Sequence, residues 1–209
     1  MATAKRRGRP RGTSGRAAVL SGAQVRHVFR IAKTKSRWSE RAEAVFALSI
    51  GLGLRAKELA SLKWTDVYDG ERASVRSVIH LKAAYTKRAR TRDVFVSSTQ
   101  VRQVLATYAE RRGPWSGRSA NAALFPSQKG GHLTASSMAR FLKGLYFDAG
   151  IPKASSHSGR RTLITGLAER GIDLKAIAEI AGHTSIRTTA MYVETNPRRL
   201  ARILQDVRW

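Results

Sequence analysis

The sequence contains no cysteine, which excludes disulfide bonds, cysteine-based zinc sites and thiol catalysis. Acidic residues are scarce and scattered, with 14 Asp and Glu in total, so no cluster suited to holding Mg²⁺ is apparent. No apolar run approaches the roughly 20 residues that a membrane-spanning helix needs. The first ten residues, MATAKRRGRP, are basic with no apolar stretch behind them and do not form a secretory signal. These absences predict a cytoplasmic protein that requires no metal and no cofactor.

Positive charge is the most unusual feature that is present. Lys and Arg number 39, giving a net charge of +25 and an isoelectric point near 11.6. Self-repulsion of this size favours a polyanionic partner, first of all a nucleic acid. An anionic membrane surface and a ribosomal-type role are the alternatives. The chain has 209 residues and is 42% hydrophobic, which is enough for a folded core in one domain or two small ones.

Residues 1–19 are predicted to form a flexible basic tail, because they hold few large apolar side chains and several glycines. Within the tail, RRGRPRG resembles an AT-hook, a short motif that binds the minor groove of AT-rich DNA. A generic basic arm explains the same residues equally well. In either case the arginines of this stretch are candidate DNA ligands: Arg6, Arg7, Arg9 and Arg11.

The pattern from residue 20 onward predicts mostly helices. Ser21 and Gln24 have the spacing of a capping box and begin a helix with an apolar face. Two more helices are predicted, from about Ser39 to the glycines of GLGLR and from about Ala56 to Leu62. In 73–96, ASVRSVIHL and RDVFVS are β-branched and partly alternating, which predicts a hairpin or small sheet around the basic YTKRART.

Helices also dominate the second half of the sequence. A capping box at SSTQ, with Ser97 as the cap, begins a helix that runs to about Arg111. Asp173 is a candidate N-cap and Gly182 a candidate residue just past a helix C-terminus. The further helices are predicted near 134–149, 160–170, 173–181, 185–192 and 197–209. The fold class is therefore mainly α with a small antiparallel β-sheet or hairpin.

Polar residues recur where these elements begin or end, and they carry the candidate chemistry. They are Arg55 in GLGLRAKELASLKW, Lys87 in YTKRARTRDVFV, His157 and Arg160 in HSGRR, His183 in AGH, and Tyr192 nine residues later. Taken singly, each has an ordinary explanation as a solvated charge, a capping or packed histidine, or a partly buried tyrosine.

As a set, the same residues favour phosphoryl transfer. His157 and Arg160 are three residues apart and would share a helix face. A guanidinium fork matches two oxygens of one phosphate, and imidazoles can exchange protons near neutral pH. A tyrosine hydroxyl can attack phosphorus when cations stabilise its anion. Such a site needs no metal.

The motifs and their order resemble the tyrosine recombinases, also called the phage integrase family. The resemblance covers about 20–209 and includes GLGLRAKELASLKWTDV, the TK…R-x-V hairpin, HSGRR and GIDLKAIAEIAGHTSIRTTAMYV. It implies a tyrosine recombinase catalytic domain over 20–209, with 197–209 as its C-terminal helix. The implied activity is site-specific DNA recombination or integration without metal or ATP.

The resemblance also implies a role for each matching residue. Tyr192 would attack the scissile phosphodiester to form a 3′-phosphotyrosyl link and free a 5′-hydroxyl. Arg55 and Arg160 would hold the non-bridging oxygens and stabilise the charge of the transition state.

The remaining roles are implied in the same way. Lys87 would protonate the leaving 5′-oxygen, although Lys82 lies in the same hairpin and is the alternative. His157 and His183 would complete the phosphate pocket, with His157 as a proton acceptor from Tyr192. Basic residues beside these motifs are candidate DNA ligands: Arg88, Arg90 and Arg161.

Two departures from the family pattern stand out. The position before Arg160 is usually Leu in the family and is Gly159 here, which predicts looser local packing. Most members also carry a separate N-terminal helical domain that closes around DNA, and none is expected here. In this respect the chain resembles the short fimbrial phase-switch invertases.

The expected partner is double-stranded DNA, with the protein at the nucleoid of a prokaryote or acting for a phage. The C-terminal helix of 197–209 either docks onto a neighbouring subunit in a DNA-bound tetramer or covers its own domain. Accessory DNA-bending proteins are further candidate partners. Two alternative functions keep the fold. One is DNA relaxation of the type IB topoisomerase kind, and the other is a DNA-binding regulator or architectural protein without catalysis.

Overall fold

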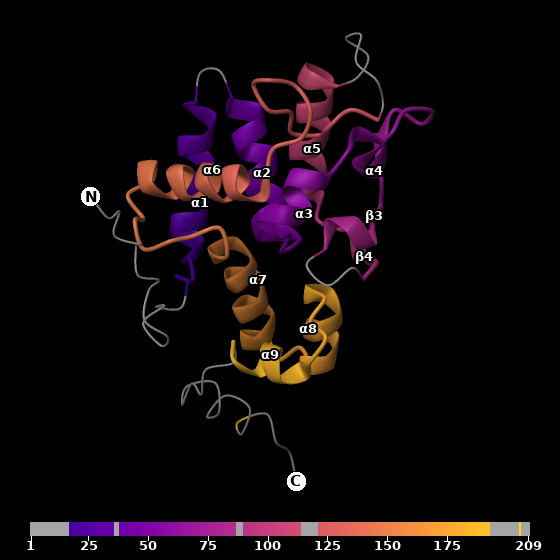
Figure 1. Ribbon diagram of the computed structural model, residues 1–209. Coiled ribbons are helices and arrows are strands. Elements are labelled where there is room, and N and C mark those ends of the chain that lie inside the picture. The colour runs from indigo at the N-terminus through magenta and orange to yellow at the C-terminus, as the bar shows by residue number, and fades with distance from the viewer. Residues whose placement is uncertain (1–16, 36–37, 87–89, 114–120, 193–204, 206–209) are drawn as a thin grey trace, which may run out of the picture.

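The computed structural model describes residues 17–35, 38–86, 90–113, 121–192 and 205. Within these ranges the fold is mostly helical with two small antiparallel sheets, as the sequence predicts. Figure 1 shows a main body that contains α1 to α6 and both sheets, and a smaller segment of α7, α8 and α9 that extends from it. No helix among the described residues is long and apolar enough to cross a membrane.

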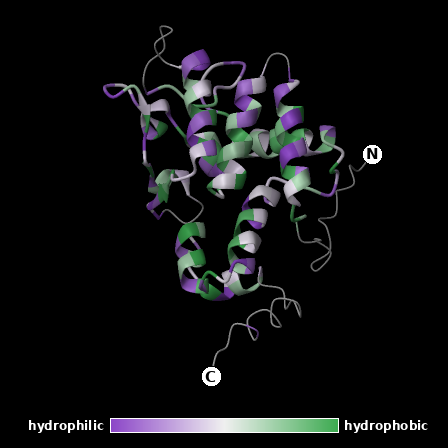
Figure 2. Cartoon of the chain, turned by 180° about the vertical axis from the view of Figure 1, so that it is seen from behind, coloured by the Kyte–Doolittle hydropathy of each residue, from purple (hydrophilic) through white to green (hydrophobic). Residues whose placement is uncertain are grey.

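Helix α2 (Ser39–Gly51) lies at the centre of the main body and is buried on nearly all sides. Helices α1 (Gly22–Lys33), α5 (Thr99–Arg112) and α6 (Ala135–Asp148) pack around it. The ring of Phe46 in α2 meets the edges of two others, with centroids 4.8 Å from Phe29 and 6.0 Å from Tyr146. Figure 2 shows the apolar residues gathered between these helices and the polar ones on the outside.

The region between α2 and α5 contains the short elements. Helix α3 (Ala56–Ser61) packs on α6, and a one-turn helix that the sequence did not predict, α4 (Trp64–Val67), follows it. Strands β1 (Tyr68–Asp69) and β2 (Ser74–Val75) form one antiparallel pair. Strands β3 (Val78–Leu81) and β4 (Arg92–Phe95) form the other, with a 3-10 turn η1 (Ala83–Tyr85) between them. The predicted hairpin is therefore confirmed, with a second small sheet before it.

The segment made by α7 (Ser158–Glu169), α8 (Leu174–Ala181) and α9 (Ile186–Ala190) has a small core of its own. This core cluster consists of Ile164, Ala168, Ile177 and Ala181, with Leu167 and Tyr192 packed against them. The main body has a much larger cluster that extends from Leu20 to Ala154. Helix α7 joins the two parts, because it packs on both α2 and α8.

Helix caps agree with the sequence at three of four positions. Ser21 and Gln24 form the predicted capping box, Asp173 caps α8, and Gly182 ends it with a left-handed φ of 61°. The cap of α5 is Ser98 rather than Ser97: its hydroxyl accepts from the backbone N–H of Val101 at 3.4 Å. Residue 97 still belongs to the extended chain after β4. The residue before it, Val96, donates its backbone N–H to the Ser77 carbonyl at 2.8 Å, so strand-like pairing continues beyond β4.

Candidate active site

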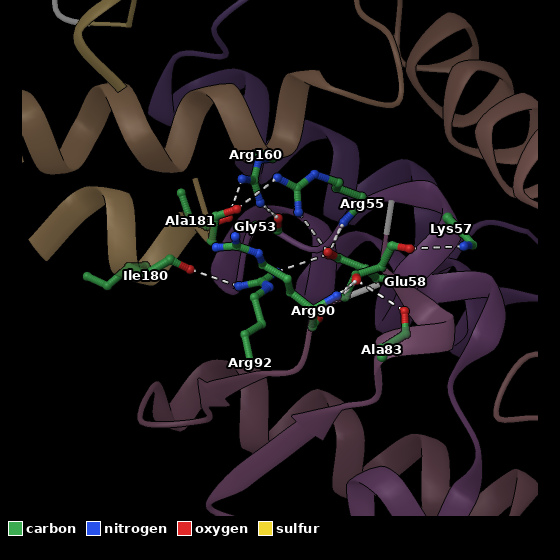
Figure 3. A network of polar contacts seen from close by, with 12 residues as sticks. Gly53, Arg55, Lys57, Glu58, Ala83, Arg90, Arg92, Arg160, Ile180 and Ala181 are labelled. Atoms are coloured by element: carbon green, nitrogen blue, oxygen red, sulfur yellow. Dashed lines mark hydrogen bonds and ion pairs between the residues drawn. The ribbon is translucent and has the colours of Figure 1, made fainter. Parts of the chain in front are cut away.

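The C-terminus of α8 is the point on which the predicted site residues converge. The last carbonyls of a helix lack partners within the helix and carry the negative end of its dipole, so they attract cations. Here three successive carbonyl oxygens, of Ile180, Ala181 and Gly182, each accept from a different arginine. The three arginines come from α7, β4 and the start of α3, and they meet in Figure 3.

Arg55 is the residue that precedes α3, and Glu58 one turn later fixes its position. The Glu58 carboxylate accepts from the Arg55 backbone N–H and from its guanidinium, both at 2.8 Å. The other terminal nitrogen of Arg55 donates to the Gly182 carbonyl at 3.3 Å. Its side chain remains 26% exposed, so N–H groups of Arg55 can still reach a ligand in solvent.

Arg160 lies deeper, on the first turn of α7, and is only 3% exposed. It donates to the Gly53 carbonyl at 2.8 Å and to the Ala181 carbonyl. Burial, with Arg55 and Arg92 nearby, lowers the pKa of Arg160 to about 9, while Glu58 and Tyr192 act in the opposite direction. Arg160 therefore remains a cation at neutral pH.

Glu58 is the anion at the centre of this cluster and is fully buried. Arg92 donates to its second oxygen at 3.0 Å, so one carboxylate holds both Arg55 and Arg92. Burial alone raises the pKa of Glu58, but the Arg92 charge and the hydrogen bonds and charge of Arg55 outweigh it, and the net pKa is lowered. Glu58 is thus ionised at neutral pH.

His183 and Tyr192 face each other at the end of the same segment. Their rings stack with centroids 5.7 Å apart and an interplanar angle of 19°. The Nδ1 atom of His183 is 2.8 Å from the hydroxyl of Thr189, which is fully buried. Tyr192 lies one turn past Thr189, whose carbonyl accepts from its backbone N–H at 2.9 Å. Helix α9 and its final turn therefore set the spacing of the histidine and the tyrosine.

The charges of the arginine cluster act on His183. Burial, followed by the Arg160, Arg55 and Arg92 cations, lowers the pKa of His183 to about 4. The imidazole is therefore neutral at physiological pH and acts as a hydrogen-bonding group there. A neutral His183 is compatible with the role that the sequence analysis gives it, as a member of the phosphate pocket.

A pocket of about 330 Å³ opens at this cluster. Arg55, Arg92 and His183 line it, together with Arg90, one of the predicted DNA ligands. The remaining lining residues are small or hydroxyl-bearing: Thr86, Thr91, Gly182, Thr184 and Thr188. The pocket thus combines positive charge with hydroxyl donors, a composition that suits a phosphate group. Among the described residues, no group of three or more His, Asp or Glu side chains is arranged to hold a metal ion.

Other predicted residues lie elsewhere or outside the described ranges. His157 is the exposed N-cap residue of α7, one turn before Arg160. Arg161 is half-buried and donates to the Ala17 carbonyl at 2.8 Å, which ties the start of the described chain to α7. Lys82 lies 3.8 Å from Asp66 and over the ring of Tyr85, away from the pocket. Arg6, Arg7, Arg9, Arg11, Lys87, Arg88 and the helix predicted at 197–209 fall outside the described residues, except for Gln205.

Gly159 corrects an expectation from the sequence. A Cβ at this position would lie 2.4 Å from the Ser49 hydroxyl oxygen and 3.0 Å from the Ser49 carbonyl carbon. Helix α7 therefore approaches α2 closely at Gly159, and the prediction of looser packing is wrong. The missing side chain is replaced by direct contact between the two helices, next to the buried Arg160.

Two residues of the cluster, Glu58 and Arg92, were absent from the sequence-based site. Glu58 had a detectable signal, because a carboxylate three residues after an arginine can pair with it on one helix face. Arg92 is the arginine of the TK…R-x-V hairpin motif, but in so basic a chain the motif alone did not show that its side chain reaches the site.

Comparison with known proteins identifies the family. Residues 18–199 match the phage integrase family. The chain belongs to the phage integrase family. Curated relatives include tyrosine recombinase XerD of Oceanobacillus iheyensis, 30% identical over 190 residues, and XerC of Rhodospirillum centenum, 33% identical over 166 residues. These matches cover 90% and 79% of this chain but only 61% and 46% of the relatives, so the chain spans about half to three-fifths of their length.

Solved structures of recombinases share the fold. The crystal structure of XerA recombinase aligns with a TM-score of 0.73 and 25% identity, covering 96% of this chain and 67% of that one. XerH recombinase bound to its difH substrate aligns with a TM-score of 0.67 at 20% identity, over 90% of this chain and 53% of that one. The mainly helical fold is therefore that of tyrosine recombinases.

Proposed function

We propose that this chain is a site-specific DNA recombinase that cuts and rejoins double-stranded DNA through a 3′-phosphotyrosyl intermediate, with residues 20–209 as its catalytic domain. The observation that carries the proposal is the meeting of Arg55, Arg160, His183 and Tyr192 around the C-terminus of α8, beside a basic pocket that Arg55 and His183 line. Family membership adds support, as do relatives that are tyrosine recombinases.

In the proposed reaction, the Tyr192 oxygen attacks phosphorus in line with the 5′-oxygen that leaves. A bond forms between tyrosine and phosphorus, the bond to the 5′-oxygen breaks, and the tyrosine proton passes to a base, for which His157 is the candidate. Arg55 and Arg160 stabilise the negative charge on the non-bridging oxygens. Because the ester energy is retained, a 5′-hydroxyl of a partner strand can reverse the attack without ATP.

His183 takes a different role in this proposal. As a neutral imidazole, it makes a hydrogen bond to the phosphate and stacks on Tyr192, rather than carrying a proton through the cycle. Lys87 is the proposed acid for the leaving 5′-oxygen. The contact of Lys82 with Asp66 supports this choice, since it directs the alternative lysine away from the pocket.

We further propose that the basic residues outside the pocket bind DNA. They are Arg6, Arg7, Arg9 and Arg11 in a basic arm at 1–19, and Arg88, Arg90 and Arg161. The net charge of +25 supports DNA as the partner. Structures of XerH with difH substrate and of lambda integrase bound to a core site, which share the fold, point the same way. We also propose that the protein forms a tetramer on DNA through 197–209, and that it acts at the nucleoid. Accessory DNA-bending proteins are further proposed partners.

The experiment that tests this function uses nicked suicide substrates containing the cognate site, selected from a DNA library by binding. Wild type should form a covalent protein–DNA adduct, and Tyr192→Phe should form none while binding the same DNA. If the protein forms the adduct and relaxes supercoiled DNA, but never joins the cut strand to a partner strand, its activity would be that of a topoisomerase. Tight binding with no adduct from wild type would favour a DNA-binding regulator.

A further inference from the structure

Arg92 connects two parts of the site that otherwise have few links. It extends from β4 in the main body, and its Nη1 donates to the Ile180 carbonyl of α8 at 2.9 Å. Its Nη2 donates to Glu58 at 3.0 Å, and Glu58 in turn holds Arg55. One guanidinium therefore joins the hairpin, the start of α3 and the end of α8, as Figure 3 shows.

The stem of Arg92 also lies against the turn that leads into His183. A Cβ at Gly182 would lie 2.6 Å from Arg92 Cδ and 3.0 Å from its Nε. Gly182 has the left-handed φ of 61° that ends α8, and His183 is the next residue. The side chain of Arg92 therefore packs directly against the backbone turn at Gly182, which sets the position of His183.

Arg92 is held by protein acceptors, as Arg55 and Arg160 are, because the terminal nitrogens of all three arginines donate to protein oxygens. The side chain of Arg92 is only 11% exposed. Arg55 makes the same kind of bridge, to Glu58 and to the Gly182 carbonyl, but its side chain is 26% exposed. Arg92 is thus held as a bridge between protein groups, and Arg55, a bridge as well, has greater access to the pocket.

The segment that Arg92 holds is weakly anchored by apolar packing. Its own core has four buried apolar residues, and α8 packs mainly on α7 and α9. Regions with few buried contacts open locally at low free-energy cost. A polar bridge from the main body to the last turn of α8 therefore has a large influence on where His183 and Tyr192 lie.

We propose that Arg92 is a positioning residue: by bridging Glu58 and the Ile180 carbonyl, it keeps the α8–α9 segment, with His183 and Tyr192, in register with Arg55 and Arg160. The expected effect of Arg92 on catalysis rests on the proposed function. The structural part, that Arg92 holds α8–α9 against the main body, does not depend on it.

The test compares Arg92→Gln and Arg92→Lys with Arg102→Gln. Arg102 is a matched control, because it is half-buried and donates to the Val96 carbonyl after the same hairpin at 2.7 Å. Lysine keeps the charge of Arg92 but has a single nitrogen and cannot reproduce the fork. Thermal unfolding of the full chain identifies any variant that fails to fold, and Arg92→Lys then carries the test.

Hydrogen exchange is the first measurement, since it needs no activity. Amides of 177–192 should exchange about ten-fold faster in Arg92→Gln and by a smaller factor in Arg92→Lys, because local opening becomes easier. Arg102→Gln should leave this segment unchanged. Unchanged exchange in both Arg92 variants, or equal acceleration in the control, would overturn the proposal.

Single-turnover cleavage at saturating DNA is the second measurement. The rate of adduct formation should fall about 10- to 100-fold in Arg92→Gln, since misplacement of reacting groups by about 1 Å has effects of this size. The Kd for DNA should change less than about three-fold, as expected when no phosphate contact is lost. A parallel loss of affinity would show Arg92 to be a DNA ligand instead. If wild type forms no adduct at all, the proposed function fails, and hydrogen exchange alone decides whether Arg92 holds the segment.

Discussion

The main body and the α7–α9 segment differ in how they are held together. The main body is built on a large apolar cluster around α2, in which several side chains are fully buried. The α7–α9 segment has a core cluster of only four buried apolar residues among those described, and it is joined to the main body through α7 and the arginine cluster. Stability should therefore depend on the first part, and the alignment of His183 and Tyr192 on the second.

The largest effect is expected where the two parts meet. Glu58→Ala removes the buried anion that holds Arg55 and Arg92, so it should lower the free energy of unfolding by about 3–5 kcal/mol, the usual range for breaking a buried pair. Urea denaturation measures it. Asp148→Asn is the control, because the Asp148–Lys35 pair is 40% exposed on both sides and should contribute less than about 1 kcal/mol. Equal losses of unfolding free energy in the two variants would mean that the arginine cluster does not hold the α7–α9 segment to the main body.

Two cavity-forming substitutions, one in each core, test the two parts separately. Leu105→Ala in α5 and Ile177→Ala in α8 each remove a nearly fully buried side chain. Leu105→Ala should lower the global unfolding free energy by about 2–5 kcal/mol, with adduct formation by the folded protein preserved. Ile177→Ala should reduce adduct formation strongly while changing global stability less, because α8–α9 opens locally. The reverse pattern, or identical behaviour, would contradict the division into two parts.

A smaller effect is expected at the joint between α7 and α2. Gly159→Ala forces a Cβ against Ser49 and should cost about 1–3 kcal/mol, as overpacking does. Adding Ser49→Ala should recover only part of the loss, because the Ser49 backbone carbon and oxygen remain 3.0 and 3.1 Å from the new atom. Denaturant titration of the single and double variants is the measurement. A neutral or stabilising Gly159→Ala would restore the expectation of loose packing.

The smallest effect is on the pH dependence of stability. The folded-state pKa of His183, about 4, lies below its ordinary value of 6.5, so between these values the unfolded chain binds more protons. The contribution of His183 to stability is fully present above pH 6.5 and is lost as the pH falls towards 4. His183→Gln should therefore show a shallower loss than wild type in this window when urea midpoints are compared. Parallel curves would indicate an imidazole with an ordinary pKa.

Much of the fold was predictable because local signals were strong. The capping box at Ser21, the N-cap Asp173 and the left-handed Gly182 each mark a helix end through backbone hydrogen bonds, which depend on few neighbours. The cap at Ser98 was placed one residue early, since two serines in succession offer the same hydroxyl and strand pairing extends to Val96. The one-turn helix α4 was missed because four residues give no periodicity to detect.

The site was predictable only in part, for a similar reason. The motifs placed Arg55, Arg160, His183 and Tyr192, and the structure brings these four together. The roles of Glu58 and Arg92 depend on contacts between residues 34 and 88 positions apart, which spacing along the chain does not encode. The neutral state of His183 likewise follows from burial and from three cations that come from different elements.

The central claim is that Tyr192 is the nucleophile of this arginine cluster, and locating the covalent link tests it most directly. The adduct formed on a suicide substrate would be digested with nuclease and trypsin and analysed by mass spectrometry. We expect the nucleotide on the tryptic peptide that begins at Thr188 and contains Tyr192, attached through the 3′-phosphate. A link to another tyrosine, such as Tyr85, or through a 5′-phosphate would contradict the account.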